Sequence, residues 1–357
     1  MKICRLKLKN FKRFENLELD FTDKDSGEPK SLILLQGNNG SGKTTVLQAI
    51  AAMLGQATGR LTQVSDLNWP GFDLNLSWLN WPSPAQVDLE VALDPVEIEA
   101  TANYHHLLAQ NGHSLPSLPE NISRFTIRLQ AGKAVSEPAS LLSLLQGRAY
   151  ATQALGVNRN LENAFDKVGF PFWYTSHRSP TSLQASPETG VPFLHEAFLR
   201  KTLTQWLTFH QQVQSQGGPL SNGVHDPFSQ LQNAYRTIFP RRRFKGLILA
   251  NLPGQAINEP WFYLHDGIRQ YEISEMSGGE RAVMPMLFDF VNWQINQSVV
   301  LIDELELHLH PPLQQALLRA LKHLGKNNQF FVTTHSDYVY NMFDKDDVVY
   351  LDRVAGP

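Results

Sequence analysis

The sequence predicts an α/β fold with a buried parallel sheet. Three short apolar runs carry that prediction, and they occupy residues 31–36, 298–304 and 329–335. Continuous apolar runs of this length are typical of parallel strands that are covered on both faces. The runs lead into a glycine loop, a pair of acids and a histidine. Polar residues that directly follow parallel strands lie at the edge of the sheet where α/β proteins bind ligands.

The first of these runs leads into a glycine loop at residues 37–44, which fits the P-loop pattern G-x-x-x-x-G-K-[ST]. The apolar residues of 45–54 predict a helix after the loop, and Gly55 predicts its end. In this context the loop N–H groups and the helix N-terminus bind phosphate. The alternative is a glycine-rich turn before an ordinary helix, and Lys43 and Thr44 argue against it. The expected nucleotide-binding residues are Gly37, Asn38, Asn39, Gly40, Ser41, Gly42, Lys43, Thr44 and Thr45.

Composition narrows the protein class. A length of 357 residues favours two domains or one elaborated domain, and the net charge of −3 gives no global attraction to nucleic acid or membranes. The single cysteine, Cys4, excludes an intramolecular disulfide and fits a reducing compartment. No apolar run reaches membrane-spanning length, and the N-terminus lacks the apolar core of a signal peptide. We therefore expect a soluble, cytoplasmic protein with no membrane partner.

The N-terminal lobe is predicted to span residues 1–94. Alternating polar and apolar residues predict paired strands at 2–11 and 16–21, with a further strand at 86–93. Lys12 and Arg13 lie in the turn between the first two strands. They either reach a nucleotide at the P-loop or are solvated surface charges, and the sequence leaves both readings open.

Residues 95–265 match no motif and predict a mixed, largely helical insertion. Its expected helices are at 96–110, 139–146, 190–216 and 226–239. A short apolar strand predicts that the chain returns to the head near 171–178, where His177 and Arg178 either enter a cleft or simply follow the strand. No heptad pattern is present, so we expect no long coiled coil.

A basic cluster at residues 240–245 follows the last of these helices. It is either a site of phosphate contact or a solvated loop.

The C-terminal lobe is predicted to span residues 266–357 and holds three further motifs. Residues 277–281 read Ser-Gly-Gly-Glu-Arg and open an apolar-periodic helix. The run at 298–304 ends in Asp303 and Glu304. The run at 329–335 ends in His335.

With the P-loop, these motifs resemble the ABC-type ATPases, in the soluble branch that includes the SMC and RecF-like proteins. The signature corresponds to 277–281, Walker B to 299–304 and the switch histidine to His335. The residues at 301–311 and 332–336 look closest to the ATPases of the OLD and Septu anti-phage groups. The resemblance implies an ABC-type ATPase head with N-terminal antiparallel strands.

The chain departs from the family at His310, where many cassette ATPases carry an aspartate after Walker B. His308 and His310 are two residues apart, which suits a metal pair. Since no other ligands are evident, we favour the non-metal interpretation.

The resemblance also implies a role for each motif. Lys43, Glu304 and His335 are the expected catalytic residues: Lys43 contacts the β- and γ-phosphates of ATP, Glu304 polarises water and His335 senses the γ-phosphate. Thr44 and Asp303 hold Mg²⁺. In a homodimer or higher homo-oligomer, Ser277, Gly278 and Gly279 cap the γ-phosphate of ATP that the partner subunit holds.

The function implied is an ATP-dependent molecular switch that controls a separate effector protein, in anti-phage defence with nucleic-acid sensing. A RecF-like ATPase of DNA repair or recombination and an ATP-gated scaffold with little turnover remain as alternatives. Only residues 337–357 follow the switch region, too few for an independent nuclease domain. The expectation is that any effector is a different protein.

Overall fold

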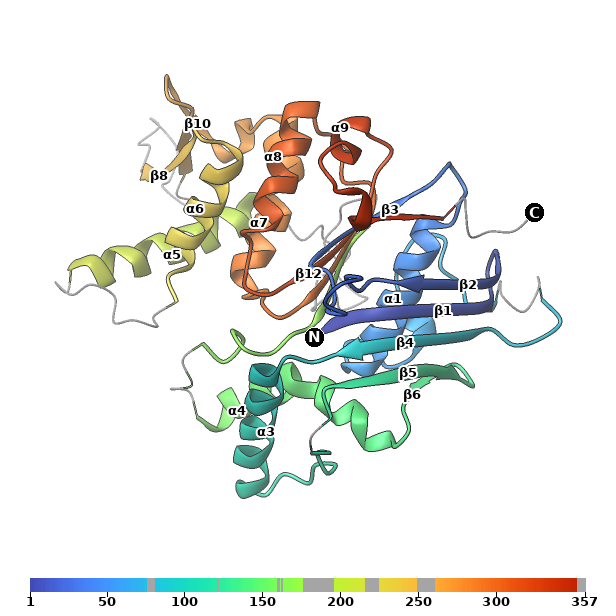
Figure 1. The fold of residues 1–357 in the computed structure, drawn as a ribbon. Helices are drawn as coiled ribbons and strands as arrows, with labels where there is room; N and C mark the ends of the chain where they lie inside the picture. Colours follow the sequence, from blue (N-terminus) through green and yellow to red (C-terminus); the bar gives the residue numbers. More distant parts are fainter. Residues whose placement is uncertain are drawn as a thin grey trace. The chain divides into compact units, whose positions relative to one another are not determined.

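The computed structural model describes residues 1–75, 81–120, 122–158, 161, 163–175, 196–215, 225–248 and 261–351. The chain forms two compact units (Figure 1). The first comprises Met1–Leu183, Ile295–Leu305 and Gly325–Pro357, and the second comprises Gln184–Gln294 and Glu306–Leu324. None of the described helices is long and apolar enough to cross a membrane.

The first unit contains an antiparallel sheet of order β2-β1-β4-β5-β6. Its strands are β1 (Lys2–Phe11), β2 (Phe14–Asp20), β4 (Gln86–Ala92), β5 (Arg124–Gln130) and β6 (Lys133–Val135). Along β1 and β2 the apolar residues are buried and all the charged ones except the half-buried Lys2 are exposed, as the alternation predicts. The stretch interpreted as an insertion supplies β5 and β6 to this sheet.

The first unit also contains the predicted parallel sheet, of order β13-β3-β12-β11-β7. Its strands are β3 (Leu32–Gln36), β7 (Pro171–Tyr174), β11 (Val299–Ile302), β12 (Gln329–Thr333) and β13 (Val348–Tyr350). Every residue of β7, β11 and β12 is buried. This burial explains why these strands read as unbroken apolar runs.

Helix α1 (Lys43–Ala57) joins the cores of the two sheets. Its apolar residues pack in one cluster with side chains of β1, β2, β11 and β12, so the loop before it is held on a rigid base. The predicted end at Gly55 is wrong, since the helix continues to Ala57. A Cβ on Gly55 would lie 2.6 Å from Cδ1 of Leu61, so the glycine allows close packing inside the helix.

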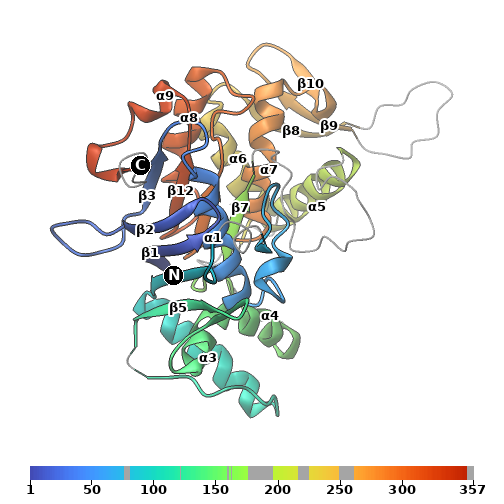
Figure 2. The same ribbon diagram turned by 90° about the vertical axis from the view of Figure 1, so that its right-hand side faces the viewer.

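The other elements of the first unit lie beside the sheets. Helices α3 (Pro95–Gln110) and α4 (Gly147–Val157) pack against each other near β5 (Figure 2). Asp94 caps α3 by accepting a hydrogen bond from the N–H of Val96. The remaining short elements are η1 (Val64–Asp66), η2 (Ala139–Gln146), α9 (Asp337–Tyr340) and η4 (Lys345–Asp347).

The second unit combines helices with a small sheet of order β10-β9-β8. Its elements are α5 (Glu196–Ser215), α6 (Pro227–Ile238), β8 (Arg243–Ile248), β9 (Trp261–His265), β10 (Gln270–Glu272), η3 (Ile273–Glu275), α7 (Gly278–Asn292) and α8 (Pro311–Leu321). Aromatic side chains fill its core: Trp206 stacks on Phe288 with centroids 5.0 Å apart, and Tyr235 packs on Phe244.

Candidate functional site

A cavity of about 680 Å³ lies at the carboxyl ends of β3, β11 and β12 in the first unit. This volume is within the range of about 300–1,000 Å³ that is typical of small-molecule sites. The cavity is lined by Lys12, Arg13, Asn39, Gly40, Gly42, Lys43, Thr44, Thr45, Asp303, Glu304, Thr333 and His335. Three motifs that are up to about 300 residues apart in the sequence therefore meet at one sheet edge.

The P-loop forms one wall of this cavity and requires its last glycine. Gly42 has φ 100°, and a Cβ there would lie 2.3 Å from the Phe14 ring. No side chain caps the start of α1, so its first N–H groups face the cavity side without a capping oxygen. The buried hydroxyl of Ser41 has no hydrogen-bond partner among the described residues. A loop with uncapped donors fits a phosphate group.

Lys43 places a cation in this loop. Its side chain is nearly buried, and Nζ donates to the carbonyl oxygens of Gly37 at 2.7 Å and Asn38 at 3.1 Å. Gly37 and Asn38 thus act through Lys43 and do not line the cavity. The ammonium is held where phosphate oxygens would enter the loop.

The strand ends bring two carboxylates to the same cavity. Asp303 accepts hydrogen bonds from Oγ1 of Thr44 at 3.0 Å and from Oγ1 of Thr333 at 2.7 Å. Glu304 has φ 52°, a left-handed conformation that is rare outside glycine and asparagine, and its N–H donates to Thr333 Oγ1 at 2.8 Å. Backbone strain of this kind occurs at functional sites, where the surrounding structure fixes it.

Thr333 is a positioning residue that the sequence did not single out. Its hydroxyl contacts both Asp303 and the backbone of Glu304. Its place just before Thr334 and His335 is the signal that would have found it. His335 itself is exposed and lines the cavity.

The turn between β1 and β2 contributes the two uncertain cations to the cavity. Lys12 is engaged by the protein itself: Nζ donates to Gln48 Oε1 at 2.8 Å and to the carbonyl oxygen of Gly71 at 2.7 Å, and burial lowers its pKa. Nε1 of Trp81 donates to the Lys12 carbonyl oxygen at 2.8 Å and fixes the turn. Arg13 is exposed at the P-loop, so it is the better placed of the two to contact a nucleotide.

The signature segment belongs to the second unit, where Ser277 is the N-cap of α7. Ser277 and Glu280 form a capping box, in which Ser277 Oγ donates to Glu280 Oε2 at 2.7 Å. The box leaves the N–H groups of Gly278 and Gly279 without an acceptor among the described residues. Gly278 is exposed, whereas a Cβ on Gly279 would lie 2.6 Å from Leu313 Cδ2.

Glu280 is the centre of a buried polar cluster that sequence reasoning missed. Its carboxylate accepts hydrogen bonds from the hydroxyls of Tyr235 and Tyr271 and forms an ion pair with Arg242. Burial favours the neutral acid, but these donors and Ser277 together hold the pKa of Glu280 below its usual value. The start of α7 is therefore anchored by a charged, fully paired side chain.

Other predicted candidates lie apart from the cavity. His308 and His310 are exposed, and no group of three or more metal-ligating side chains is present in the described part of the chain. His310 is the residue before α8. His177 and Arg178 lie outside the described residues.

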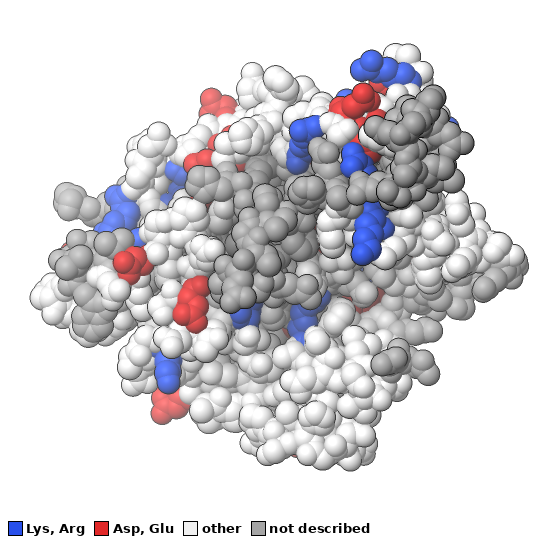
Figure 3. All heavy atoms as spheres, turned by 180° about the vertical axis from the view of Figure 1, so that it is seen from behind, with Lys and Arg blue, Asp and Glu red and all other residues white. Residues whose placement is uncertain are grey.

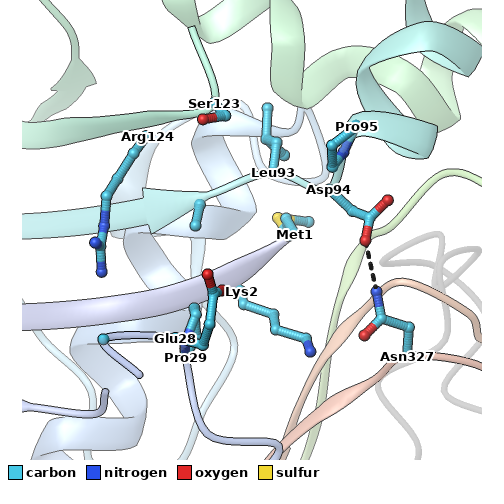
Figure 4. Close-up of a pocket in the computed structure, with 12 residues that line it drawn as sticks. Met1, Lys2, Glu28, Pro29, Leu93, Asp94, Pro95, Ser123, Arg124 and Asn327 are labelled. Carbon is cyan, nitrogen blue, oxygen red and sulfur yellow. Dashed lines mark hydrogen bonds between the residues drawn. The ribbon is translucent and has the colours of Figure 1, made fainter. Parts of the chain in front are cut away.

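A second cavity of about 350 Å³ lies at the start of α3, also in the first unit. Figure 4 shows Lys2, Asp94 and Asn327 around it, with the Asn327 amide donating to Asp94 at 3.4 Å. Because Asp94 is already the cap of α3, we assign this cavity a structural role.

Two family models match the segments that carry these motifs. One, described as an AAA domain, matches residues 5–82. The other, described as "AAA domain, putative AbiEii toxin, Type IV TA system", matches residues 190–341. The first match contains the P-loop, and the second contains the signature, Walker B and the switch histidine.

Two curated relatives and one solved structure are also similar to this chain. The "Retron Ec83 probable ATPase" of Escherichia coli is 23% identical over 98% of this chain and 71% of its own length. RecF, the DNA replication and repair protein of Lactococcus lactis, is 35% identical over 29% of this chain and 27% of its own length. The crystal structure of an SMC head bound to the C-winged helix domain of ScpA shares the fold, with a TM-score of 0.50, 18% identity and coverage of 98% of this chain and 94% of that one. Together, the motif matches, the relatives and the fold support an ATPase similar to the SMC and RecF-like proteins of the ABC type.

The two AAA-domain matches indicate an enzyme that hydrolyses ATP. The cavity in the first unit has a volume and a lining that fit a nucleotide. The chemistry of the lining residues fits nucleotide and metal: a lysine in a glycine loop, a threonine hydroxyl beside an aspartate, and a second acid. ATP phosphates with Mg²⁺ are the ligand for which such a set is suited.

Proposed function

We propose that this ATPase is a switch in which two copies enclose ATP between them. Lys43 and the loop N–H groups bind the β- and γ-phosphates, and Thr44 and Asp303 hold Mg²⁺. The observation that carries the proposal is the contact between Thr44 and Asp303 beside the strained Glu304, with Lys43 on the facing loop. Glu304 orients and polarises the attacking water, and His335 contacts the γ-phosphate.

The signature of the partner copy completes each site. Ser277 is exposed at the start of α7, and the N–H groups of Gly278 and Gly279 point out of the first turn. A helix N-terminus with two such donors fits a γ-phosphate presented by another subunit. ATP then holds two heads together, and hydrolysis separates them.

We further propose that this switch acts in the cytoplasm on a separate effector protein in anti-phage defence, with nucleic acid as the trigger. The similarity to a retron ATPase over almost the whole chain supports this role. The match to RecF covers a smaller part of the chain and supports the alternative role in DNA repair. Purification with the products of neighbouring genes separates the two roles, since a co-purified toxin or nuclease would favour defence.

The Glu304→Gln variant tests the switch. It keeps the size and shape of the side chain but removes the charge that polarises water, so ATP binding should persist while hydrolysis stops. Sedimentation with ATP and Mg²⁺ should then show a stable dimer that disappears with ADP. A variant that binds ATP and remains monomeric would refute the ATP-bound dimer. Glu306→Gln, two residues along the chain, is the matched control.

A further inference from the structure

The turn between α6 and β8 carries a run of arginines that the proposed switch does not use. Arg241, Arg242 and Arg243 follow Pro240, and Arg236 lies in the last turn of α6. Together with Gly267, from the turn between β9 and β10, they line a surface hollow of about 260 Å³. Figure 3 shows basic side chains in the region of this small sheet, beside a few acidic ones.

Most of this positive charge is uncompensated. Arg236, Arg241 and Arg243 are exposed, and in the described ranges no acidic side chain is within ion-pair distance of them. Exposed guanidinium groups that share one hollow repel one another, so the hollow favours an anion. Structural arginines are normally neutralised by the protein, as Arg200 is by Glu272 at 2.7 Å in the same unit.

The volume of the hollow and its arginine lining indicate which kind of anion it binds. Its volume is below the range of about 300–1,000 Å³ that is typical of sites for whole small molecules. A phosphate group on a longer chain fits better, since the guanidinium fork matches phosphate oxygens. In a nucleic-acid backbone each phosphate carries one negative charge at regular spacing, so separate arginines can each contact one.

We propose that this arginine hollow binds the phosphate backbone of a nucleic acid, and that Arg242 connects it to the signature helix. The second half rests on the proposed function, in which the start of α7 completes the partner's ATP site. The first half rests on the proposed nucleic-acid trigger, for which it names a binding surface, and it does not depend on the ATP-bound dimer.

Arg242 both lines the arginine hollow and contacts the start of α7. Its NH1 pairs with the buried Glu280 and lies 3.4 Å from Ser277 Oγ. Its Nε and NH2 have no hydrogen-bond partner in the part of the chain that the structure describes, so these donors remain for a phosphate. A phosphate bound to these donors would hold the guanidinium in one position, and with it Glu280 and the first turn of α7. Because the signature would then be preorganised for the partner's γ-phosphate, ATP turnover should rise.

Binding is tested by fluorescence anisotropy with labelled single-stranded DNA, RNA and duplex DNA over a salt series, without ATP. The test variant combines Arg236→Gln, Arg241→Gln and Arg243→Gln and spares the Arg242–Glu280 pair. The control combines Lys201→Gln, Arg319→Gln and Lys322→Gln, three exposed cations of the same unit that lie outside the hollow. The test variant should lose at least about tenfold in affinity, and its salt slope should fall by about 2, while the control matches the wild type.

Equal affinity and slope in the test variant and the wild type would overturn the proposal. Binding of the wild type to anionic lipid vesicles but to none of the nucleic acids would also overturn it, and would reassign the hollow to a membrane surface.

The connection is tested by ATP turnover with saturating oligonucleotide. Turnover of the wild type should rise, and that of the test variant should not. If the oligonucleotide binds through the hollow but wild-type turnover stays unchanged, only the proposed role of Arg242 is refuted. The dimer of Glu304→Gln still tests the switch separately, so the two failures are distinguishable.

Discussion

Helices α1 and α7 both begin at a glycine-containing motif, yet the N–H groups of their first turns differ in whether a side chain caps them. Gly42 precedes α1 in a left-handed conformation, and no side chain caps that helix. Ser277 precedes α7 in an extended conformation, and Glu280 closes a capping box with it. The first helix start has a lysine beside it, whereas the second has a buried carboxylate.

The difference separates two kinds of anion site. The start of α1 offers donors and a cation, so it can hold phosphate within one subunit. The start of α7 already contains a negative charge at its third residue, and only the N–H groups of Gly278 and Gly279 remain. We therefore propose that the start of α7 does not bind a nucleotide alone and instead contacts a phosphate that another subunit has already fixed.

If α1 is the primary site, Lys43→Ala should have the largest effect. The variant loses the only P-loop cation, and charge-assisted contacts to phosphate are worth about 1.5–3 kcal/mol each. ATP affinity measured by isothermal titration should fall at least about 100-fold. Lys24→Ala, at an exposed lysine of the same unit, should bind like the wild type. Unchanged affinity in Lys43→Ala would remove the distinction between the two helix starts.

Glu280→Gln tests whether the second helix start is anchored by its buried charge. Removal of one member of a buried ion pair leaves Arg242 uncompensated, which typically costs about 3–5 kcal/mol. Urea unfolding should show this loss of stability. The exposed Glu275→Gln serves as control and should cost less than about 1 kcal/mol. Equal stability of the two variants would show that the cluster does not anchor α7.

Acid should destabilise the second unit through Glu272, which lies five residues before the signature. Burial favours its protonation, but the Arg200 guanidinium and the hydroxyl and N–H of Ser274 lower its pKa to about 2 from 4.5. Because the folded pKa is depressed, this carboxylate stabilises the fold above pH 4.5, and the stabilisation is lost as pH falls towards about 2. Urea unfolding over that pH range should show a smaller loss for Glu272→Gln. An identical pH dependence in Glu272→Gln and the wild type would contradict the role of the Glu272 carboxylate.

Arg13→Gln should have the smallest effect. Arg13 lines the cavity proposed for the nucleotide but is exposed, so its attraction to phosphate is screened by solvent. We expect a loss of about tenfold or less in ATP affinity, and a larger loss at low salt than at high salt. Lys12→Gln should instead lower stability, because Lys12 bonds to Gln48 and Gly71. A salt-independent effect of Arg13→Gln would argue against phosphate contact.

The first helix start was predictable from the sequence, and the second was predictable only in part. Residues 37–44 are contiguous, so their chemistry can be read directly, and the buried strands that lead to Asp303 and His335 are unbroken apolar runs. The partners of Glu280 are not contiguous: Tyr235, Arg242 and Tyr271 come from a helix, a turn and a strand, and only the fold brings them together.

Two fold predictions show where local reasoning fails. Strand β5 alternates clearly, with Phe125 and Ile127 buried, so its signal was present within a stretch interpreted as mixed. Gly55 was interpreted as a helix end, yet it lies inside α1, and Leu61 packs where its side chain would be. A glycine alone does not distinguish a stop signal from a packing requirement.

The claim that ATP is shared between the two helix starts of different subunits is tested most directly by mixing two variants. Ser277→Arg should bind ATP like the wild type but fail to hydrolyse it, and Lys43→Ala should fail to bind it. Mixed dimers should regain turnover, because one of their two sites pairs an intact P-loop with an intact signature. Wild-type turnover by Ser277→Arg alone would contradict the account.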